Sequence, residues 1–111
     1  MRHKIYPAAR RRIIEIWHYT DKVWGEKQAD KYVRGLYQAI ERAAINKYLW
    51  RKVEHEDVKG IFFVRYEHHY VFFRELSKDV LGVVNVLHES MDIPSRLKED
   101  FYEQKEKGRR L

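Results

Sequence analysis

The fold is most constrained by two amphipathic helical patterns that follow one another with only a glycine between them. In residues 8–24 and again in residues 26–46, apolar side chains recur at spacings of three and four, which places one apolar stripe along each helix. Gly25 can adopt the left-handed conformation that often ends a helix. So short a connection predicts an antiparallel helical hairpin, whose stripes need a common apolar surface to cover. The stripes comprise Ile13, Ile16, Trp17, Thr20, Val23 and Trp24, and then Ala29, Tyr32, Val33, Leu36, Ile40 and Ala43.

Three short apolar segments after the hairpin supply this surface. Residues 60–68, 70–76 and 80–88 are rich in β-branched and aromatic side chains and are separated by polar turns, so they are predicted to form an antiparallel meander. Gly82 inside the last strand indicates a bulge or the close approach of another segment. A short edge strand is predicted before the hairpin at residues 3–7, and a loop is predicted at residues 46–59.

The order of these elements, β-α-α-β-β-β, predicts an α+β fold in which a helical hairpin packs on a small antiparallel sheet. The chain has 111 residues, which fits one domain, and we expect that domain to span residues 1–97. Asp92 and Pro94 mark a break after the last strand, and residues 98–111 are predicted to form a charged, helical C-terminal tail.

The charge balance favours an anionic partner. Lysine and arginine number 23 against 17 acidic residues, a formal net charge of +6, which steers nucleic acid or an acidic protein segment toward the chain. The chain has no cysteine, which excludes disulfides and thiolate metal sites. It shows neither a secretory signal nor an apolar run long enough to cross a bilayer. We therefore expect a cytoplasmic protein without membrane contact or cofactor.

The stretch "VLHESMD" places a histidine, a carboxylate and a serine side by side at His88, Glu89 and Ser90. These residue types occur in nucleophilic catalysis, but the members of such a triad usually come from separate parts of the chain. Neighbouring residues of a strand point to opposite faces, so His88 and Glu89 should diverge. The glycines of a nucleophile elbow are also missing around Ser90. The stretch is better explained as a strand end, with Ser90 or Asp92 organising a turn.

Two adjacent histidines, His68 and His69, could bind a metal together with His55 and His88. Adjacent residues at a hairpin tip point apart, and no established metal-binding spacing such as HExxH occurs. A solvated turn explains the pair equally well, so no metal site is expected.

Several cations and one tryptophan are candidates for partner binding. Arg10, Arg11 and Arg12 begin the first helix, where positive charge opposes the helix dipole. Arginines also interrupt the apolar strands at positions 65 and 74, where each either forms a salt bridge or offers its guanidinium to a carboxylate or phosphate. Trp50 falls in the predicted loop, and an exposed tryptophan there would be a protein-binding anchor. The candidate partner-binding and target-binding residues are Arg10, Arg11, Arg12, Trp50, Arg65, Arg74, His88 and Arg96.

Three stretches, "IWHYTDKVWGEKQADKYVRGLYQAIERA", "YVFFREL" and "VVNVLHESMDIPSRL", give the chain a family likeness. From about residue 3 to residue 97 it resembles the ParE-like branch of the RelE/ParE toxin superfamily. The resemblance implies a small α+β toxin of a type II toxin–antitoxin system, held inactive by a labile, acidic, ParD-like antitoxin. ParE-like toxins are associated with poisoning DNA gyrase, and RelE-like toxins with cutting mRNA on the ribosome. Fold alone cannot choose between these two activities.

The residues help to choose between them. RNA cleavage requires groups that deprotonate a ribose hydroxyl, stabilise the phosphorane and protonate the leaving oxygen. RelE-like nucleases supply these with basic residues, whereas here the first meander strand offers only Arg65, and Val71 stands about where an arginine is expected. Catalytic residues are therefore not expected. A substitute set for a ribonuclease would be Arg65, His88 and Tyr102.

The leading hypothesis is a toxin that binds and inhibits DNA gyrase. The alternatives are a ribosome-dependent endoribonuclease and a non-toxic binding module on the same scaffold, with nucleic-acid contact open in each case. One departure from the resemblance bears on toxicity, because many ParE-like chains place an arginine two or three residues before His88. Here Asn85 occupies that neighbourhood.

Overall fold

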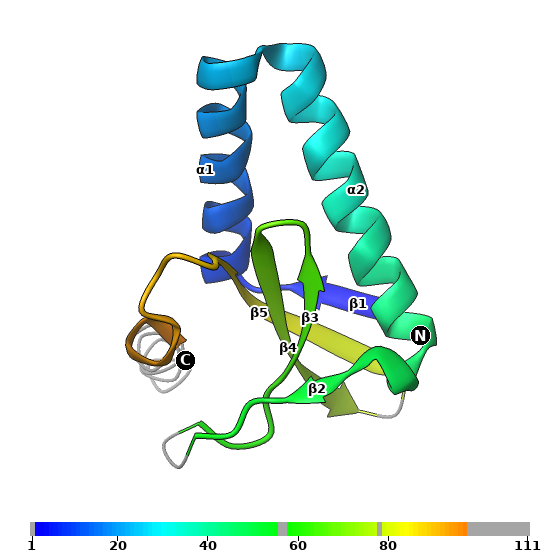
Figure 1. The fold of residues 1–111 in the computed structure, drawn as a ribbon. Helices are drawn as coiled ribbons and strands as arrows, with labels where there is room; N and C mark the ends of the chain where they lie inside the picture. Colours follow the sequence, from blue (N-terminus) through cyan, green and yellow to red (C-terminus); the bar gives the residue numbers. More distant parts are fainter. Residues whose placement is uncertain (1, 56–57, 78, 98–111) are drawn as a thin grey trace.

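A computed structural model of the chain describes residues 2–55, 58–77 and 79–97. The elements in chain order are β1 (Arg2–Ile5), α1 (Pro7–Trp24), α2 (Glu26–Ile45), a 3₁₀ helix (Lys47–Leu49), β2 (Arg51–Lys52), β3 (Phe62–Tyr66), β4 (His69–Ser77) and β5 (Val80–His88). Residues 93–97 are also helical. Figure 1 shows the two long helices standing side by side over one sheet. The predicted α+β class is confirmed.

The helical hairpin forms where the sequence predicts it. Pro7 occupies the start of α1, where its fixed φ suits the helix and its missing N–H is not needed. Gly25 has φ 94°, and its N–H donates to the carbonyl of Asp21 while its own carbonyl accepts from Ala29. A side chain at this φ would be strained, so this one residue can end α1 and begin α2.

The predicted stripe of α1 is wrong at its C-terminal end. Thr20 is buried and its hydroxyl donates to the carbonyl of Ile16 at 2.7 Å, but Val23 and Trp24 are 50% and 72% exposed. The reason is visible in Figure 1, where the closed end of the hairpin projects beyond the sheet. The last turn of α1 therefore has apolar spacing but no sheet beneath it.

The sheet differs from the expected antiparallel sheet in two ways. The meander of β3, β4 and β5 is present, but β1 pairs with β5 in parallel, so the five-stranded sheet is mixed, with the order β1-β5-β4-β3-β2. In addition, the segment predicted as a loop contains β2, which pairs with Phe62 and Phe63 of β3. A strand of two residues is too short to leave an alternating pattern in the sequence.

Trp50 directly precedes β2 and is half-buried against the core, so it is not the exposed anchor that a tryptophan in a loop would offer. Its ring lies 4.9 Å from that of Phe73 and 5.5 Å from that of Phe62, centroid to centroid. Its Nε1 donates to the carbonyl of Ala43 at 2.7 Å. Burying the indole against the core brings Arg51 and the residue after it alongside β3.

The sheet carries apolar clusters on both faces. The cluster between helices and sheet contains Leu36, Ile40, Phe73, Leu81, Val83 and Val86, among others. The cluster on the opposite face contains Val58, Ile61, Phe72, Val84, Leu87 and Leu97. Strand β5 contributes to both and is buried from position 81 to position 87, which explains its nearly continuous apolar sequence.

Two irregularities fit β5 between these clusters. The register with β4 shifts at Val84, since Phe72 pairs with Asn85 and Phe73 with Val83. This bulge leaves Asn85 1% exposed, with its Oδ1 accepting from the N–H of Val86. At Gly82 a Cβ would lie 3.0 Å from the side chain of Leu76, so the predicted close approach is confirmed.

The C-terminal expectations are tested only as far as residue 97. Leu97 is buried, while residues 98–111, including Tyr102, lie outside the described residues, so the domain boundary stays a prediction. Among the helices of residues 2–55, 58–77 and 79–97, none has the length and apolarity needed to span a membrane.

Candidate functional site

Two hollows border α2, one between α2 and α1 and the other between α2 and strands β2 and β3. The first, the hairpin hollow, has a volume of about 1070 Å³ and includes Ile16, Tyr19, Trp24, Tyr32, His69 and His88 in its lining. The second, the sheet-edge hollow, has a volume of about 780 Å³ and includes Arg42, Leu49, Arg51, Phe63, Arg65 and Tyr70. Tyr66 lines both hollows. Its hydroxyl donates to the carbonyl of Tyr32 at 2.9 Å, so it stands between them as a fixed partition.

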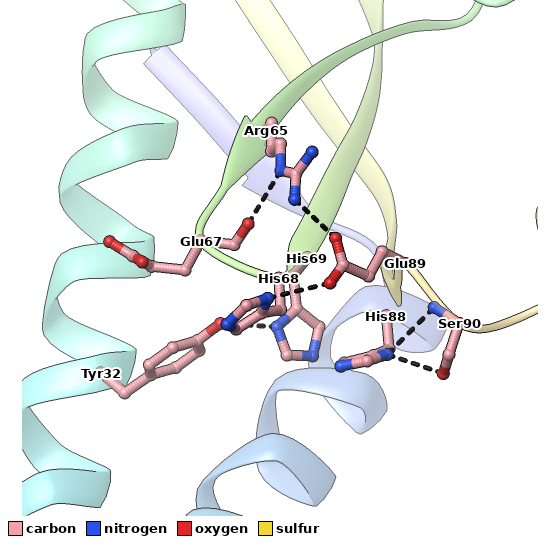
Figure 2. A network of polar contacts seen from close by, with 8 residues as sticks. All are labelled: Tyr32, Arg65, Glu67, His68, His69, His88, Glu89 and Ser90. Carbon is pink, nitrogen blue, oxygen red and sulfur yellow. Dashed lines mark hydrogen bonds and ion pairs between the residues drawn. The ribbon is translucent and has the colours of Figure 1, made fainter.

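A polar network joins the β3–β4 turn to the end of β5 (Figure 2). The carboxylate of Glu89 accepts from Arg65 Nη2 at 2.5 Å and from His68 Nδ1 at 2.9 Å. Arg65 Nε donates to the carbonyl of Glu67 at 2.9 Å. The hydrogen bond from His68, reinforced by the charge of Arg65, lowers the pKa of Glu89. Glu89 therefore stays ionised and holds the guanidinium of Arg65 in one orientation.

His69 and Tyr32 form a second part of the network, turned toward α2 (Figure 2). The Tyr32 hydroxyl lies 2.7 Å from His69 Nδ1. Burial, followed by the neighbouring His88 and His68, lowers the pKa of His69 to about 4, and burial raises the pKa of Tyr32 to about 12. At neutral pH the tyrosine therefore donates to an uncharged imidazole, which joins α2 to β4.

His88 and Glu89 diverge as the sequence predicts. His88 Nδ1 lies 2.7 Å from Ser90 Oγ and accepts from the Ser90 N–H at 3.1 Å, whereas Glu89 contacts Arg65 and His68. In a catalytic triad the acid would orient the histidine that activates the serine. Here the acid points elsewhere, and the prediction that Ser90 organises a turn at the strand end is confirmed.

The histidines proposed as metal ligands are only partly brought together. The His88 ring lies 5.0 Å from that of His69 and 6.3 Å from that of His68, centroid to centroid. His55 instead forms an isolated bridge with Val58. Across the part of the chain that the structure describes, no three His, Asp or Glu side chains are placed to hold a metal ion.

The predicted arginines are dispersed over the molecule. Arg12 lines the hairpin hollow and contacts Glu15 at 3.4 Å, while Arg10 and Arg11 are exposed at the start of α1. Arg74 is half-buried in β4 opposite Gly82, and Arg96 is exposed in the helical residues 93–97. Arg65 lines the sheet-edge hollow and His88 the hairpin hollow, so this pair does not face one common space.

The sequence interpretation missed Tyr32, Tyr66, Arg42 and Arg51 as site residues, and it considered His69 only as a metal ligand. Their positions depend on how α2 lies against the β3 edge, which no local pattern records. Gly35 was the available signal, because a glycine inside a helix often marks a close approach. Its Cα lies directly against the Tyr66 hydroxyl, so a Cβ has no room there.

Comparisons with known proteins agree with this architecture. The family described as "ParE toxin of type II toxin-antitoxin system, parDE" matches residues 4–93. Toxin ParE1 of Mycobacterium tuberculosis (strain ATCC 25618 / H37Rv) is 36% identical over 96 residues, which cover 86% of this chain and 97% of that protein. Toxin ParE of Escherichia coli is 35% identical over 82 residues, which cover 74% of this chain and 79% of that protein.

A solved structure described as "Chromosomal ParDE TA system from P. aeruginosa" superposes with a TM-score of 0.68. The sequences are 16% identical, and the match covers 79% of this chain and 95% of that one, so the likeness concerns the fold. The resemblance that the sequence motifs indicate is thus confirmed. The chain belongs to the ParE toxin family of type II toxin–antitoxin systems.

Proposed function

We propose that this toxin acts by binding and inhibiting DNA gyrase, without catalysis by its own residues. The observation that carries the proposal is the separation of Arg65 and His88 into different hollows. A ribonuclease needs its base, acid and phosphate-binding cation around a single scissile phosphate. Two of the three residues of the substitute set do not meet this requirement, and membership of the ParE family supports gyrase as the target.

A supercoiling assay with purified toxin and gyrase tests the proposal. We expect loss of supercoiling at micromolar toxin and its recovery when the antitoxin is added first. Unaltered gyrase activity at large toxin excess would contradict gyrase as the target. Mapping of transcript 5′ ends after toxin induction covers the ribonuclease alternative, since new cuts inside translated codons would show it instead.

We further propose that the hairpin hollow receives an acidic, amphipathic, ParD-like antitoxin segment. Tyr19 and Trp24 line it while 68% and 72% exposed, and large apolar side chains left in water are typical of partner-binding surfaces. An amphipathic helix binds such a groove by placing apolar anchors into it. The net charge of +6 steers an acidic partner toward the toxin.

If the toxin also contacts the DNA bound by gyrase, we expect positively charged side chains outside the hairpin hollow to make this contact. Arg10 and Arg11 are exposed at the start of α1 and are the strongest candidates. The side chain of Asn85 is 1% exposed, so the target would be contacted through other positions. If induction of the chain caused no growth arrest, the non-toxic binding module would replace this proposal.

A further inference from the structure

The sheet-edge hollow has a charge pattern that the hairpin hollow lacks. Its lining includes the arginines Arg42, Arg51 and Arg65, from α2, β2 and β3, against the single acid Glu54. The hairpin hollow is balanced, with Arg12 and Lys31 against Glu15 and Glu67. The two hollows therefore suit different partners: the first favours apolar anchors, and the second favours an anion.

Two of these arginines are available for a new contact. Arg42 and Arg51 are exposed, and within the described residues neither forms an ion pair with a carboxylate. Arg42 lies close enough to Tyr66 for its charge to act on the pKa of that hydroxyl. Like charges around one hollow repel each other, and a bound anionic group relieves that repulsion.

Arg65 is the one arginine of this lining that has a carboxylate partner within the described residues, Glu89. Its Nη2 binds Glu89 while its Nε is fixed by the carbonyl of Glu67. The guanidinium is thus held in place before any partner arrives, which reduces the entropy lost on binding. Arg65 is already paired with Glu89, so a partner carboxylate would be met chiefly by the exposed Arg42 and Arg51.

The remaining lining favours a protein segment over single-stranded nucleic acid. Leu49, Val53 and Ile93 are aliphatic. The rings of Phe63 and Tyr70 pack edge to face at 85°, and the Arg65 guanidinium lies 5.6 Å from the Tyr70 ring. Bases stack on free aromatic faces, and these faces are already engaged with one another and with the cation.

We propose that the sheet-edge hollow binds an acidic, amphipathic segment of the toxin's protein target, separately from the antitoxin in the hairpin hollow. The inference rests on the proposed function in one respect, that the toxin acts by binding a protein. A toxin of this family has to recognise two proteins, and the differing chemistry of the two hollows gives each protein its own surface.

The test uses the full chain and removes the two exposed charges. The variants are Arg42→Gln/Arg51→Gln and the stronger Arg42→Glu/Arg51→Glu. The matched control is Lys22→Gln/Lys27→Gln, which removes two charges from the closed end of the hairpin, where neither lysine lines a hollow. Circular dichroism and thermal unfolding establish that all variants fold.

We expect the glutamine variant to reduce growth arrest on induction by roughly tenfold or more and the glutamate variant to abolish it. Affinity for the antitoxin should stay within about threefold of the wild type, and the lysine control should arrest growth like the wild type. Salt sensitivity of gyrase inhibition should fall in the glutamine variant, because fewer ion pairs form.

Each other outcome has a definite meaning. Full growth arrest by the glutamate variant overturns the inference, as does a parallel loss of antitoxin affinity, which would assign the hollow to the antitoxin. Loss of single-stranded DNA binding in step with toxicity would assign it to nucleic acid and overturn the inference as well. If the wild type fails to arrest growth, there is no target to bind and the inference falls.

The gyrase assay separates this inference from the proposed function. Suppose that the wild-type toxin leaves supercoiling unaltered but arrests growth, and that the glutamate variant does not arrest growth. Gyrase is then the wrong target, and the inference that the sheet-edge hollow binds the target is kept. If the wild type and the glutamate variant inhibit gyrase equally, gyrase is the target, but the sheet-edge hollow is not the surface that binds it.

Discussion

At the scale of single residues, Gly35 is where the packing of α2 on the sheet is decided. A glycine inside a helix is less favourable than alanine by about 1 kcal/mol, and α2 carries this cost because the Tyr66 hydroxyl occupies the space of a side chain. That hydroxyl in turn donates to the carbonyl of Tyr32. The close approach therefore joins β3 to α2 and sets the partition between the two hollows.

Gly35→Ala should destabilise the fold although it improves helix propensity. Forcing a methyl group into a filled space typically costs about 1–3 kcal/mol, and we expect a loss in this range in urea unfolding. Tyr66→Phe in the same chain should recover part of the loss, because the hydroxyl is the nearest atom. Gln38→Ala on the exposed side of α2 serves as the control and should change stability little. A stabilised Gly35→Ala variant would contradict the contact.

A second residue-scale prediction concerns His69 and pH. Its pKa in the folded chain is lowered from 6.5 to about 4, so below pH 6.5 the unfolded chain takes up a proton that the folded chain refuses. Stability should therefore fall as the pH drops from 6.5 toward 4. Glu89, whose pKa is also lowered from 4.5, contributes a loss of the same sign, but only below 4.5. Asparagine does not titrate, so in the His69→Asn variant the urea midpoint of unfolding should depend less on pH between 6.5 and 4.5. If the midpoint of this variant fell with pH as steeply as that of the wild type, a buried, neutral His69 would be contradicted.

At the scale of elements, the hairpin is longer than the sheet that it covers. Trp24 and Trp50 illustrate the difference, since Trp24 is 72% exposed at the closed end while Trp50 packs between α2 and the sheet. Trp24 is therefore left open to solvent, whereas Trp50 belongs to the packing around the core. The sequence suggested the reverse roles, because spacing alone placed Trp24 on the apolar stripe and Trp50 in a loop.

Trp24→Ala should separate binding from folding. We expect the free energy of unfolding to change by less than about 0.5 kcal/mol, while the Kd for the antitoxin rises about tenfold or more. Trp50→Ala is the matched comparison, and it should lower stability by about 3 kcal/mol or more. Isothermal titration and urea unfolding measure the two effects. If Trp24→Ala binds the antitoxin with unchanged affinity, the hairpin hollow is not the antitoxin-binding site.

The elements themselves were largely predictable, and the reasons for the exceptions are physical. Long periodic segments specify α1 and α2, and alternating or continuous apolar runs specify β3, β4 and β5. The two-residue β2 depends on the docking of Trp50, a contact that is remote in sequence from Phe73. The parallel pairing of β1 with β5 likewise depends on the closed fold.

The candidate site was less predictable than the fold. His88, Arg65 and Arg12 were found as individual residues, yet their division between two hollows follows from the course of α2 past Tyr66. Arg42 and Arg51 belong to no recognisable sequence motif. They line the same hollow only because α2 and β2 lie next to each other in the fold. Charge composition indicated an anionic partner without indicating where it binds.

At the scale of the whole molecule, the net charge of +6 should govern how fast partners bind. Charges of opposite sign accelerate encounter, and salt screens them over about 10 Å at 0.1 M. If the antitoxin segment is acidic as proposed, its association rate should fall about tenfold or more between roughly 50 and 500 mM salt, while the dissociation rate changes less. Stopped-flow fluorescence of the exposed tryptophan would measure both rates. An association rate independent of salt would contradict electrostatic steering.

The edge pairing of β1 with β5 has a consequence for synthesis of the toxin. Strand β1 finds its partner only in residues 80–83, which are synthesised after α1, α2, β3 and β4. Until then the nascent chain exposes an incomplete sheet and cannot present either hollow in finished form. The hairpin hollow is thus complete only once Val86 and His88 have been made, and an antitoxin already present in the cell can meet each toxin molecule as it folds.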